Sequence, residues 1–258
     1  MKTIHNSEDF EGMRKAGNLA AKTLDLLTNH VKPGASTAEL DRIAFDFIDA
    51  NNGFIAPLFY KGFPKSICTS LNHVICHGIP SNRILESGDI VNIDVTVIID
   101  GWHGDTSRMF IVGECSIKAK KLIKVTYDSM MKAIKTIKAN TRIGNIGYTI
   151  QKIVEAEGFS VVRDFCGHGI GKKFHESPNV LHYGEKDSGQ ELKEGMIFTV
   201  EPMINSGKFE TKTLKDGWTA VTKDKSLSAQ FEHTVGVTKE GYEIFTLSKK
   251  SLNFPPNL

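Results

Sequence analysis

Apolar residues recur at steps of three and four in four segments of the chain, which predicts four helices. The first segment begins near Ser7, and its apolar face consists of Phe10, Met13, Gly17, Ala20, Leu24 and Leu27. Ser7 is predicted to cap this helix. The second helix is predicted to begin at Ser36-Thr37-Ala38-Glu39, a capping-box pattern, and to end at Asn52-Gly53. Two further helices are expected over residues 116–138 and 143–157.

Between and after these pairs of helices the pattern changes to that of strands. Residues 90–99 are rich in β-branched side chains and precede Asp100-Gly101, a strong hairpin-turn signal. Residues whose numbers sum to 201 should then face each other, so Asp105 faces Thr96. Asp94 becomes a diagonal neighbour of Asp105 on one face of the sheet. Similar strand patterns occur at residues 196–200 and 231–237.

The chain also repeats this order of elements. His77-Gly78-Ile79 is echoed by His168-Gly169-Ile170, and an acid follows nine residues after a leucine in both Leu85–Asp94 and Leu192–Glu201. We predict one α+β domain over residues 1–258, with two pseudo-symmetric helix-helix-hairpin halves at roughly 7–113 and 116–250. Antiparallel sheets would lie inside and helices outside. Two such halves packed about an approximate two-fold axis would bring Asp94 and Glu201 together at the centre. The alternative is that the repeat is a chance similarity among common residues.

Composition and charge exclude several classes of protein. Apolar residues make up 40% of the chain and charged residues 24%, which is typical of a soluble globular protein. A net charge of +2 argues against a DNA coat, and no apolar run is long enough to span a membrane. The polar start of the chain predicts that there is no signal peptide. Four cysteines without a CxxC pair predict reduced thiols and a cytoplasmic location.

Four acids lie in apolar, strand-like surroundings: Asp94, Asp105, Glu201 and Glu232. Neighbouring buried carboxylates repel each other, so one must take up a proton unless a divalent cation lies between them. Taken singly, Glu201 and Glu232 could each be an acid at a sheet edge or on the surface. Four acids in strand cores, two of them at equivalent positions of the repeat, favour a metal site.

Three histidines accompany these acids. His168 lies in the glycine-rich segment Cys166–Gly171, which cannot be a helix interior, and His175 follows seven residues later. His77 lies in an extended or turned segment. Each could be structural, and the glycine-rich segment could cradle a phosphate, although it lacks the Lys-Ser/Thr ending of a phosphate loop. Two Asp, one His and two Glu suit hard or borderline divalent ions, and five such ligands can hold two metals.

Together and in this order, the motifs resemble type I methionine aminopeptidase in its short bacterial form. The matching stretches are Pro64-Lys65-Ser66, Cys76-His77-Gly78-Ile79-Pro80, Asn92-Ile93-Asp94-Val95, His103-Gly104-Asp105-Thr106, Cys166-Gly167-His168-Gly169-Ile170-Gly171, Thr199-Val200-Glu201-Pro202-Met203 and Gln230-Phe231-Glu232-His233-Thr234. The resemblance covers essentially the whole chain. It implies the pita-bread fold and co-translational removal of the initiator methionine when the second residue is small, by a hydroxide bridging two divalent metals.

The resemblance also implies a role for each residue of the site. Asp94 would chelate the first metal, Asp105 and Glu232 would bridge both, and His168 and Glu201 would complete the second. Glu201 would also shuttle the proton of the bridging water.

The remaining roles concern the substrate and a further cation. His77 and His175 would hydrogen-bond the scissile amide and the developing oxyanion. An apolar methionine pocket would consist of Tyr60, Phe63, Cys68, Phe174 and Trp218. Many relatives have tyrosine where this chain has Phe63, and the residues alone would identify all five as core. A weaker match to a monovalent cation site is formed by Asn72, Val74 and Ser228.

Cobalt, manganese, iron and zinc all suit such a mixed oxygen and imidazole site. A monomer is expected from the resemblance, with N-terminal methionine peptides as substrates. The family acts on nascent chains, and transient ribosome association is therefore predicted through a cluster of lysines in the segment before Glu232. The candidates are Lys208, Lys212, Lys215, Lys223 and Lys225. A solvated lysine-rich loop is the alternative interpretation.

Two other functions remain open at this point. A proline-specific aminopeptidase or dipeptidase would have a similar metal set, but such enzymes usually carry a large N-terminal domain. The first helix, starting near residue 7, is expected to leave no room for one. A non-catalytic binding protein on the same fold would lose metal ligands, whereas this chain keeps all five.

Overall fold

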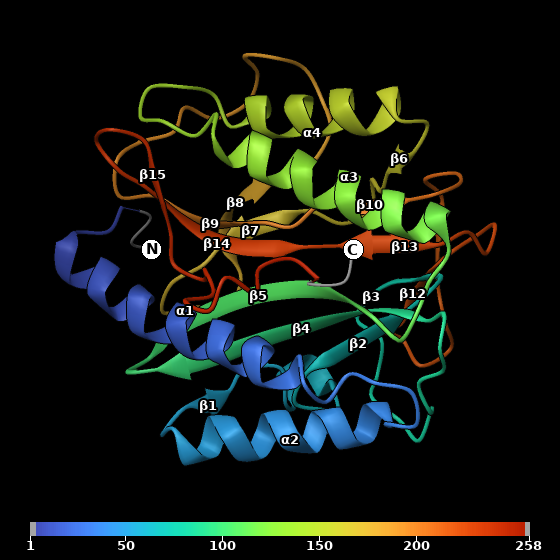
Figure 1. Cartoon of the computed structure of the whole chain (residues 1–258). Helices are drawn as coiled ribbons and strands as arrows, with labels where there is room; N and C mark the ends of the chain where they lie inside the picture. The colour runs from blue at the N-terminus through green and yellow to red at the C-terminus, as the bar shows by residue number, and fades with distance from the viewer. Residues whose placement is uncertain (1–3, 256–258) are drawn as a thin grey trace.

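The computed structural model describes residues 4–255, and residues 1–3 and 256–258 lie outside it. Strands form the middle of the molecule and helices cover it on two sides (Figure 1). Helices α1 (Ser7–Leu27) and α2 (Thr37–Ala50) lie on one side, and α3 (Ile117–Ile134) and α4 (Gly144–Ala156) on the other. The α+β arrangement with sheet inside and helices outside is therefore confirmed. Within the described range, no helix is both long and apolar enough to cross a membrane.

The two N-terminal helices begin at well-formed caps. The predicted cap at Ser7 is wrong by one residue, because the Asn6 side chain accepts the Asp9 amide at 3.0 Å and Asp9 accepts the Asn6 amide at 2.9 Å. Ser36 caps α2 as predicted, by accepting the Glu39 amide at 3.1 Å. The predicted third helix is too long, since α3 ends at Ile134.

The central sheet has nine strands, and the main path runs β1-β4-β5-β14-β9-β7-β8, with β2 beside β4 and β15 beside β14. These strands are β1 (Phe54–Ile55), β2 (Cys68–Leu71), β4 (Ile90–Ile99), β5 (Trp102–Ile111), β7 (Gly167–Gly169), β8 (Glu176–Val180), β9 (Ile197–Val200), β14 (Glu232–Val237) and β15 (Tyr242–Ile244). Strand β5 pairs with β14 through Glu232 opposite Ser107, which joins early and late parts of the chain.

Two three-stranded sheets accompany the central one. The first has the order β13-β10-β6 and the second β11-β12-β3. Their strands are β3 (Val74–Cys76), β6 (Ser160–Val161), β10 (Met203–Asn205), β11 (Thr211–Thr213), β12 (Ala220–Thr222) and β13 (Ser228–Gln230). A short 3-10 helix, η1 (Tyr60–Gly62), lies between β1 and β2.

The register of the β4–β5 hairpin is the one that the turn signal predicts. Thr96 pairs with Asp105, Ile99 pairs with Trp102, and Asp94 pairs with Ser107. Asp94 and Asp105 therefore lie diagonally on one face of the sheet. Because side chains alternate along a strand, a shift of one residue would turn both carboxylates to the opposite face.

Buried apolar side chains form one large cluster under each pair of helices. One packs α1 and α2 against β4 and β5, and the other packs α3 and α4 against β9 and β14. The predicted apolar face of α1 is buried in full. Helix α1 lies so close to β5 that a Cβ atom at Gly104 would lie 2.3 Å from the Ala16 carbonyl carbon. This close contact fixes the strand that carries Asp105.

An ion pair between Arg108 of β5 and Asp25 of α1 is buried beneath the sheet. The Arg108 Nη2 atom donates to Asp25 Oδ1 at 3.0 Å, and the Ser248 hydroxyl donates to Asp25 Oδ2 at 2.8 Å. The two charged side chains are only 5% and 4% exposed. A buried charge that loses its partner is costly because neither water nor a counterion replaces it.

We expect Asp25→Ala to lower the free energy of unfolding by about 3–5 kcal/mol, because it leaves the Arg108 charge buried and unpaired. The matched control is Asp46→Ala, which removes the exposed pair with Arg42 at 3.4 Å and should cost less than about 1 kcal/mol. Urea unfolding of both variants measures the difference. Equal costs would contradict a structural role for the buried pair.

Candidate metal centre and substrate pocket

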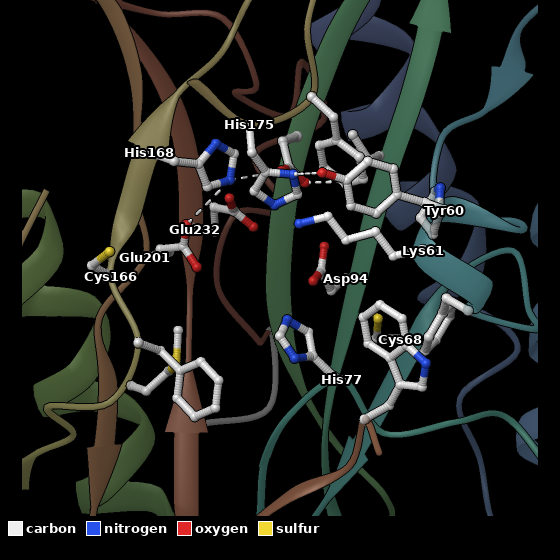
Figure 2. A pocket seen from close by; sticks show the side chains of 18 of the residues that line it. Tyr60, Lys61, Cys68, His77, Asp94, Cys166, His168, His175, Glu201 and Glu232 are labelled. Carbon is white, nitrogen blue, oxygen red and sulfur yellow. Dashed lines mark hydrogen bonds and ion pairs between the residues drawn. The ribbon is translucent and has the colours of Figure 1, made fainter. Parts of the chain in front are cut away.

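One cavity of about 330 Å³ receives side chains from the central sheet and from the loops around it (Figure 2). All of the predicted metal ligands, catalytic histidines and methionine-pocket residues line it: Tyr60, Phe63, Cys68, His77, Asp94, Asp105, His168, Phe174, His175, Glu201, Trp218 and Glu232. The other lining residues have no role that the sequence predicts, and they are Pro57, Lys61, Thr96, Asp164, Phe165, Cys166 and Met203.

The predicted ligands converge from five different strands or strand ends. Asp105, His168 and Glu232 offer ligand atoms that all lie within 4.8 Å of one another. The His168 Nε2 atom lies 3.6 Å from Asp105 Oδ2 and 3.6 Å from Glu201 Oε1. Asp94 lines the same cavity from β4. Such a set of carboxylate and imidazole atoms can hold a divalent ion.

Hydroxyl groups hold two of these carboxylates in place. The Thr96 hydroxyl donates to Asp105 Oδ1 at 2.7 Å, and the Thr199 hydroxyl donates to Glu201 Oε1 at 2.7 Å. Groups that orient ligands in this way also tune a metal site. Sequence reasoning missed both roles, although Thr96 was already predicted to face Asp105.

A buried histidine, His182, fixes the backbone of Glu201. The Glu201 amide donates to His182 Nε2 at 3.1 Å. Burial lowers the pKa of His182 to about 3, which keeps the ring neutral and able to accept this bond. The sequence offers no signal for this role, because His182 lies outside the motifs and is brought to Glu201 only by the fold.

Burial raises the pKa of Asp94 and of Glu232 well above the usual carboxyl range, and the neighbouring acids Asp105 and Glu201 raise both further. Burial also raises the pKa of Glu201 to about 7, against the opposing effect of His168. Burial disfavours a charged His168, but Asp105 and Glu201 outweigh it and raise its pKa. Negative charge is therefore crowded here, and bound divalent cations would relieve the crowding. The residues fit a metal centre.

The other two histidines line the same cavity, beside Tyr60 and Trp218. His175 Nδ1 lies 3.0 Å from the Tyr60 hydroxyl, and its ring centroid is 4.2 Å from that of His168. Burial, and then the nearby His168, lower the pKa of His175 to about 4. Burial also lowers the pKa of His77, whose ring meets Trp218 edge-on at 6.0 Å. Both rings are therefore neutral near pH 7.

Aromatic rings form an apolar wall beside these histidines. Phe63 meets Trp218 edge to face at 5.2 Å, and Tyr60 packs against Phe174 at 4.9 Å. Phe63 is only 3% exposed, and Cys68 pairs with Asp94 across β2 and β4. The predicted pocket residues are thus brought together next to the predicted ligands.

The residues matched to a monovalent cation site are brought together less completely. Asn72 and Val74 line a separate cavity of about 280 Å³, which Ser228 does not line. The Ser228 amide donates to the Asn72 carbonyl at 2.8 Å. The Asn72 carboxamide also bonds to Asp89 at 2.8 Å and accepts the Ile90 amide at 3.1 Å. This cation site stays a prediction.

A buried cluster of carboxylates and histidine on a curled antiparallel sheet is typical of a metallopeptidase, and residues 11–239 match metallopeptidase family M24. The chain belongs to this family, and its fold is the pita-bread fold. It is 60% identical to methionine aminopeptidase from Rickettsia prowazekii over 254 residues, which cover 98% of each chain. It is 55% identical to the Escherichia coli K12 methionine aminopeptidase over 249 residues, covering 96% of this chain and 94% of that one.

Solved structures agree with this assignment. The crystal structure of the Rickettsia prowazekii enzyme superposes with a TM-score of 0.94, over 95% of this chain and 99% of that chain. The prolidase of Pyrococcus horikoshii shares only the fold, with 22% identity and a TM-score of 0.76. This chain covers 65% of that longer protein.

We expect His168→Ala to weaken binding of Mn²⁺ by at least about tenfold, because it removes a ligand from the centre. His175→Ala is the matched control, and it should bind Mn²⁺ within about twofold of the unmodified protein. Calorimetric titration of chelator-treated protein measures both affinities. Equal weakening in the two variants would mean that the two histidines do not differ in role.

Proposed function

We propose that this chain hydrolyses the N-terminal methionine from nascent proteins and peptides whose second residue is small. One observation carries the proposal: a single cavity of about 330 Å³ is lined both by crowded carboxylates with His168 and by the aromatic rings of Phe63 and Trp218. Relatives that are 55–60% identical over nearly their whole length are named methionine aminopeptidases. The combination favours an aminopeptidase over a non-catalytic binding protein.

In the proposed centre, Asp94 would hold one divalent ion, His168 and Glu201 would hold a second, and Asp105 and Glu232 would serve as ligands to both. Manganese, iron, cobalt and zinc all suit these ligands. When bound, such ions supply Lewis acidity and make water more acidic. A weaker proposal is that Asn72, Val74 and Ser228 bind a monovalent cation. This cation would stabilise the structure and take no part in the reaction.

Glu201 is the proposed proton carrier. Glu201 is buried and lines the cavity beside the other acids, and a positioned carboxylate can both accept and return a proton. The Thr199 hydroxyl holds Oε1, and the Gln230 amide lies 3.4 Å from Oε2. These contacts would aim the carboxylate at the scissile amide.

His77 and His175 are the proposed hydrogen-bond donors to the substrate. Both are neutral near pH 7, so each ring carries one proton. When the Tyr60 hydroxyl donates to His175 Nδ1, the proton of His175 lies on Nε2 and can be donated to the developing oxyanion. A positioned donor of this kind contributes about 10²–10³ in rate.

We further propose a single catalytic domain over residues 1–258 that acts as a monomer in the cytoplasm. Its two halves would be residues 7–113 and 116–250. The separate apolar cluster under each pair of helices supports this division. A proline-specific enzyme is less favoured, because the two Pyrococcus prolidases that share the fold are only 21–22% identical to this chain.

Cleavage should be efficient only when methionine comes first and Gly, Ala, Ser or Thr second. Aromatic faces at Phe63, Phe174 and Trp218 suit the polarizable thioether. A large second side chain should collide with His77 and His175 and move the scissile carbonyl; a shift of about 1 Å can cost about 10²-fold in rate.

A peptide panel varied at its first two positions measures this preference with metal-loaded enzyme. Norleucine at the first position should remain usable, because a pocket discriminates poorly between chains of similar shape. Lysine or glutamate there should fail, because burying a charge is costly. Comparable cleavage of Met-Gly, Met-Lys and Leu-Gly peptides would instead indicate a broad aminopeptidase.

Transient docking on the ribosome is proposed for the basic hairpin formed by β11, β12 and their flanks. Its lysines are all exposed: Lys208, Lys212, Lys215, Lys223 and Lys225. The same hairpin carries Trp218 to the cavity, so docking there would bring nascent chains near the site.

Binding to ribosomal RNA through this hairpin should weaken steeply with salt. Changing Lys212, Lys215 and Lys225 to glutamate should abolish co-sedimentation with ribosomes. The matched control reverses three exposed lysines on or after α3, which are Lys118, Lys132 and Lys138. Unchanged co-sedimentation of the first variant would refute the proposal.

A further inference from the structure

The turn around η1 holds residues in an uncommon backbone conformation at the edge of the cavity. Phe59 has a φ of 65° and Lys61 a φ of 47°, in the left-handed region that residues other than glycine rarely adopt. Strained residues of this kind cluster at functional sites. Backbone bonds close the turn, from the Phe59 amide to the Phe63 carbonyl at 2.7 Å and from the Phe63 amide to the Tyr60 carbonyl at 3.0 Å.

This turn is also held against the opposite wall of the cavity. The Tyr60 hydroxyl lies 3.0 Å from His175 Nδ1, and the two rings stack at 5.2 Å. Lys61, the next residue, therefore starts from a fixed position beside the proposed methionine pocket. Its side chain lines the cavity, and its ammonium group points inward from the rim toward the space between His175 and Asp94 (Figure 2).

The Lys61 ammonium has no anionic partner among the residues that the structure describes. Its contact is the Tyr60 ring, 5.3 Å from Nζ to the ring centroid. Lys65, four positions later, approaches the Asp41 carboxylate at 3.8 Å instead. A lysine that lines a cavity without a partner can attract a carboxylate that enters with a ligand.

The geometry of an extended peptide indicates where that carboxylate would be. Successive side chains point to opposite sides, so the first and third residues share a side and lie about 6.5–7 Å apart. If the first side chain enters the pocket that Tyr60 and Phe63 line, the third side chain lies on the same side of the peptide, toward the mouth of the cavity, where the exposed side chain of Lys61 can turn outward to meet it. The substrate's own N-terminal amine is positive and would be repelled there.

Resting on the proposed function, we propose that Lys61 determines specificity by binding a carboxylate at the third position of the substrate. This carboxylate is either an acidic side chain or the free C-terminus of a tripeptide. The inference concerns substrate preference downstream of the cleaved bond, and Lys61 takes no part in the chemical step.

Kinetics with matched peptides test the proposal on the metal-loaded enzyme at low salt. The first pair is Met-Gly-Glu-Gly and Met-Gly-Gln-Gly, both amidated at the C-terminus. The second pair is Met-Gly-Gly as free acid and as amide. The acidic member of each pair should be cleaved with a kcat/KM about two- to five-fold higher, mainly through a lower KM. The advantage should shrink as salt screens the charges. An effect in one pair alone identifies which source of the carboxylate Lys61 binds.

Lys61→Met should bring the ratio within each pair to about one, while Lys61→Arg should retain it. The matched control is Lys173→Met, which removes an exposed charge from a residue that does not line the cavity. This control should keep the wild-type ratio. Ratios of one in the wild-type enzyme, or ratios that survive Lys61→Met, would overturn the proposal.

The amidated glutamine peptide separates this proposal from the function on which it rests. Its cleavage by both wild type and Lys61→Met, together with an unchanged ratio, would overturn only the role of Lys61. Failure of the metal-loaded wild type to cleave any of the four peptides would overturn both. Retained cleavage of the glutamine peptide by Lys61→Met also shows that the variant is folded.

Discussion

Mutual repulsion of buried carboxylates is the constraint on which the rest of this structure depends. Asp94, Asp105, Glu201 and Glu232 line one cavity, and burial raises the pKa of three of them, Asp94, Glu201 and Glu232. A chain gains nothing in stability from such a cluster, because each desolvated acid costs free energy. The cluster is therefore best understood as a site prepared for cations. Favourable packing in the rest of the fold offsets the free energy that desolvation of these acids costs.

The fold meets this constraint by fixing strands rather than by pairing each acid with a base. The register of β4 and β5 sets two of the acids, and the pairing of β5 with β14 adds Glu232. Behind the sheet, the buried pair of Arg108 and Asp25 ties β5 to α1. The buried positive charge of Arg108 thus stabilises the scaffold and does not neutralise the acids of the cavity.

The part of the cavity that His77 and His175 line follows a different principle. There the polar groups are neutral rings, since burial lowers the pKa of His77 and His175, and the walls are aromatic. A neutral, partly apolar surface suits a methionine side chain and a polarised amide. Lys61 is the exception, because its ammonium group has no anionic partner among residues 4–255, and we therefore propose it as a recognition group.

By itself, the sequence determined the four helices to within a few residues, the longer strands, the hairpin register and the set of candidate ligands. Strand alternation and a strong turn signal depend only on neighbouring residues. Counting residues outward from the Asp100-Gly101 turn therefore places Asp105 opposite Thr96, as the structure has it. The resemblance that the motifs carry likewise indicated the ligands, the two further histidines and the pocket residues that line the cavity. The cap of α1 was misplaced by one residue, because Asn6 and Ser7 are both good caps and only the bond to Asp9 distinguishes them.

Tertiary structure alone decided which groups support that set. His182 reaches the Glu201 amide, and Tyr60 reaches His175, across long stretches of chain that no local pattern relates. The sequence does not predict the left-handed φ of Phe59 and Lys61, because the only glycine of this turn is the next residue, Gly62. Such contacts arise from the packing of whole strands and loops, whose energy is spread over many residues, and a sequence pattern records only the interactions between near neighbours.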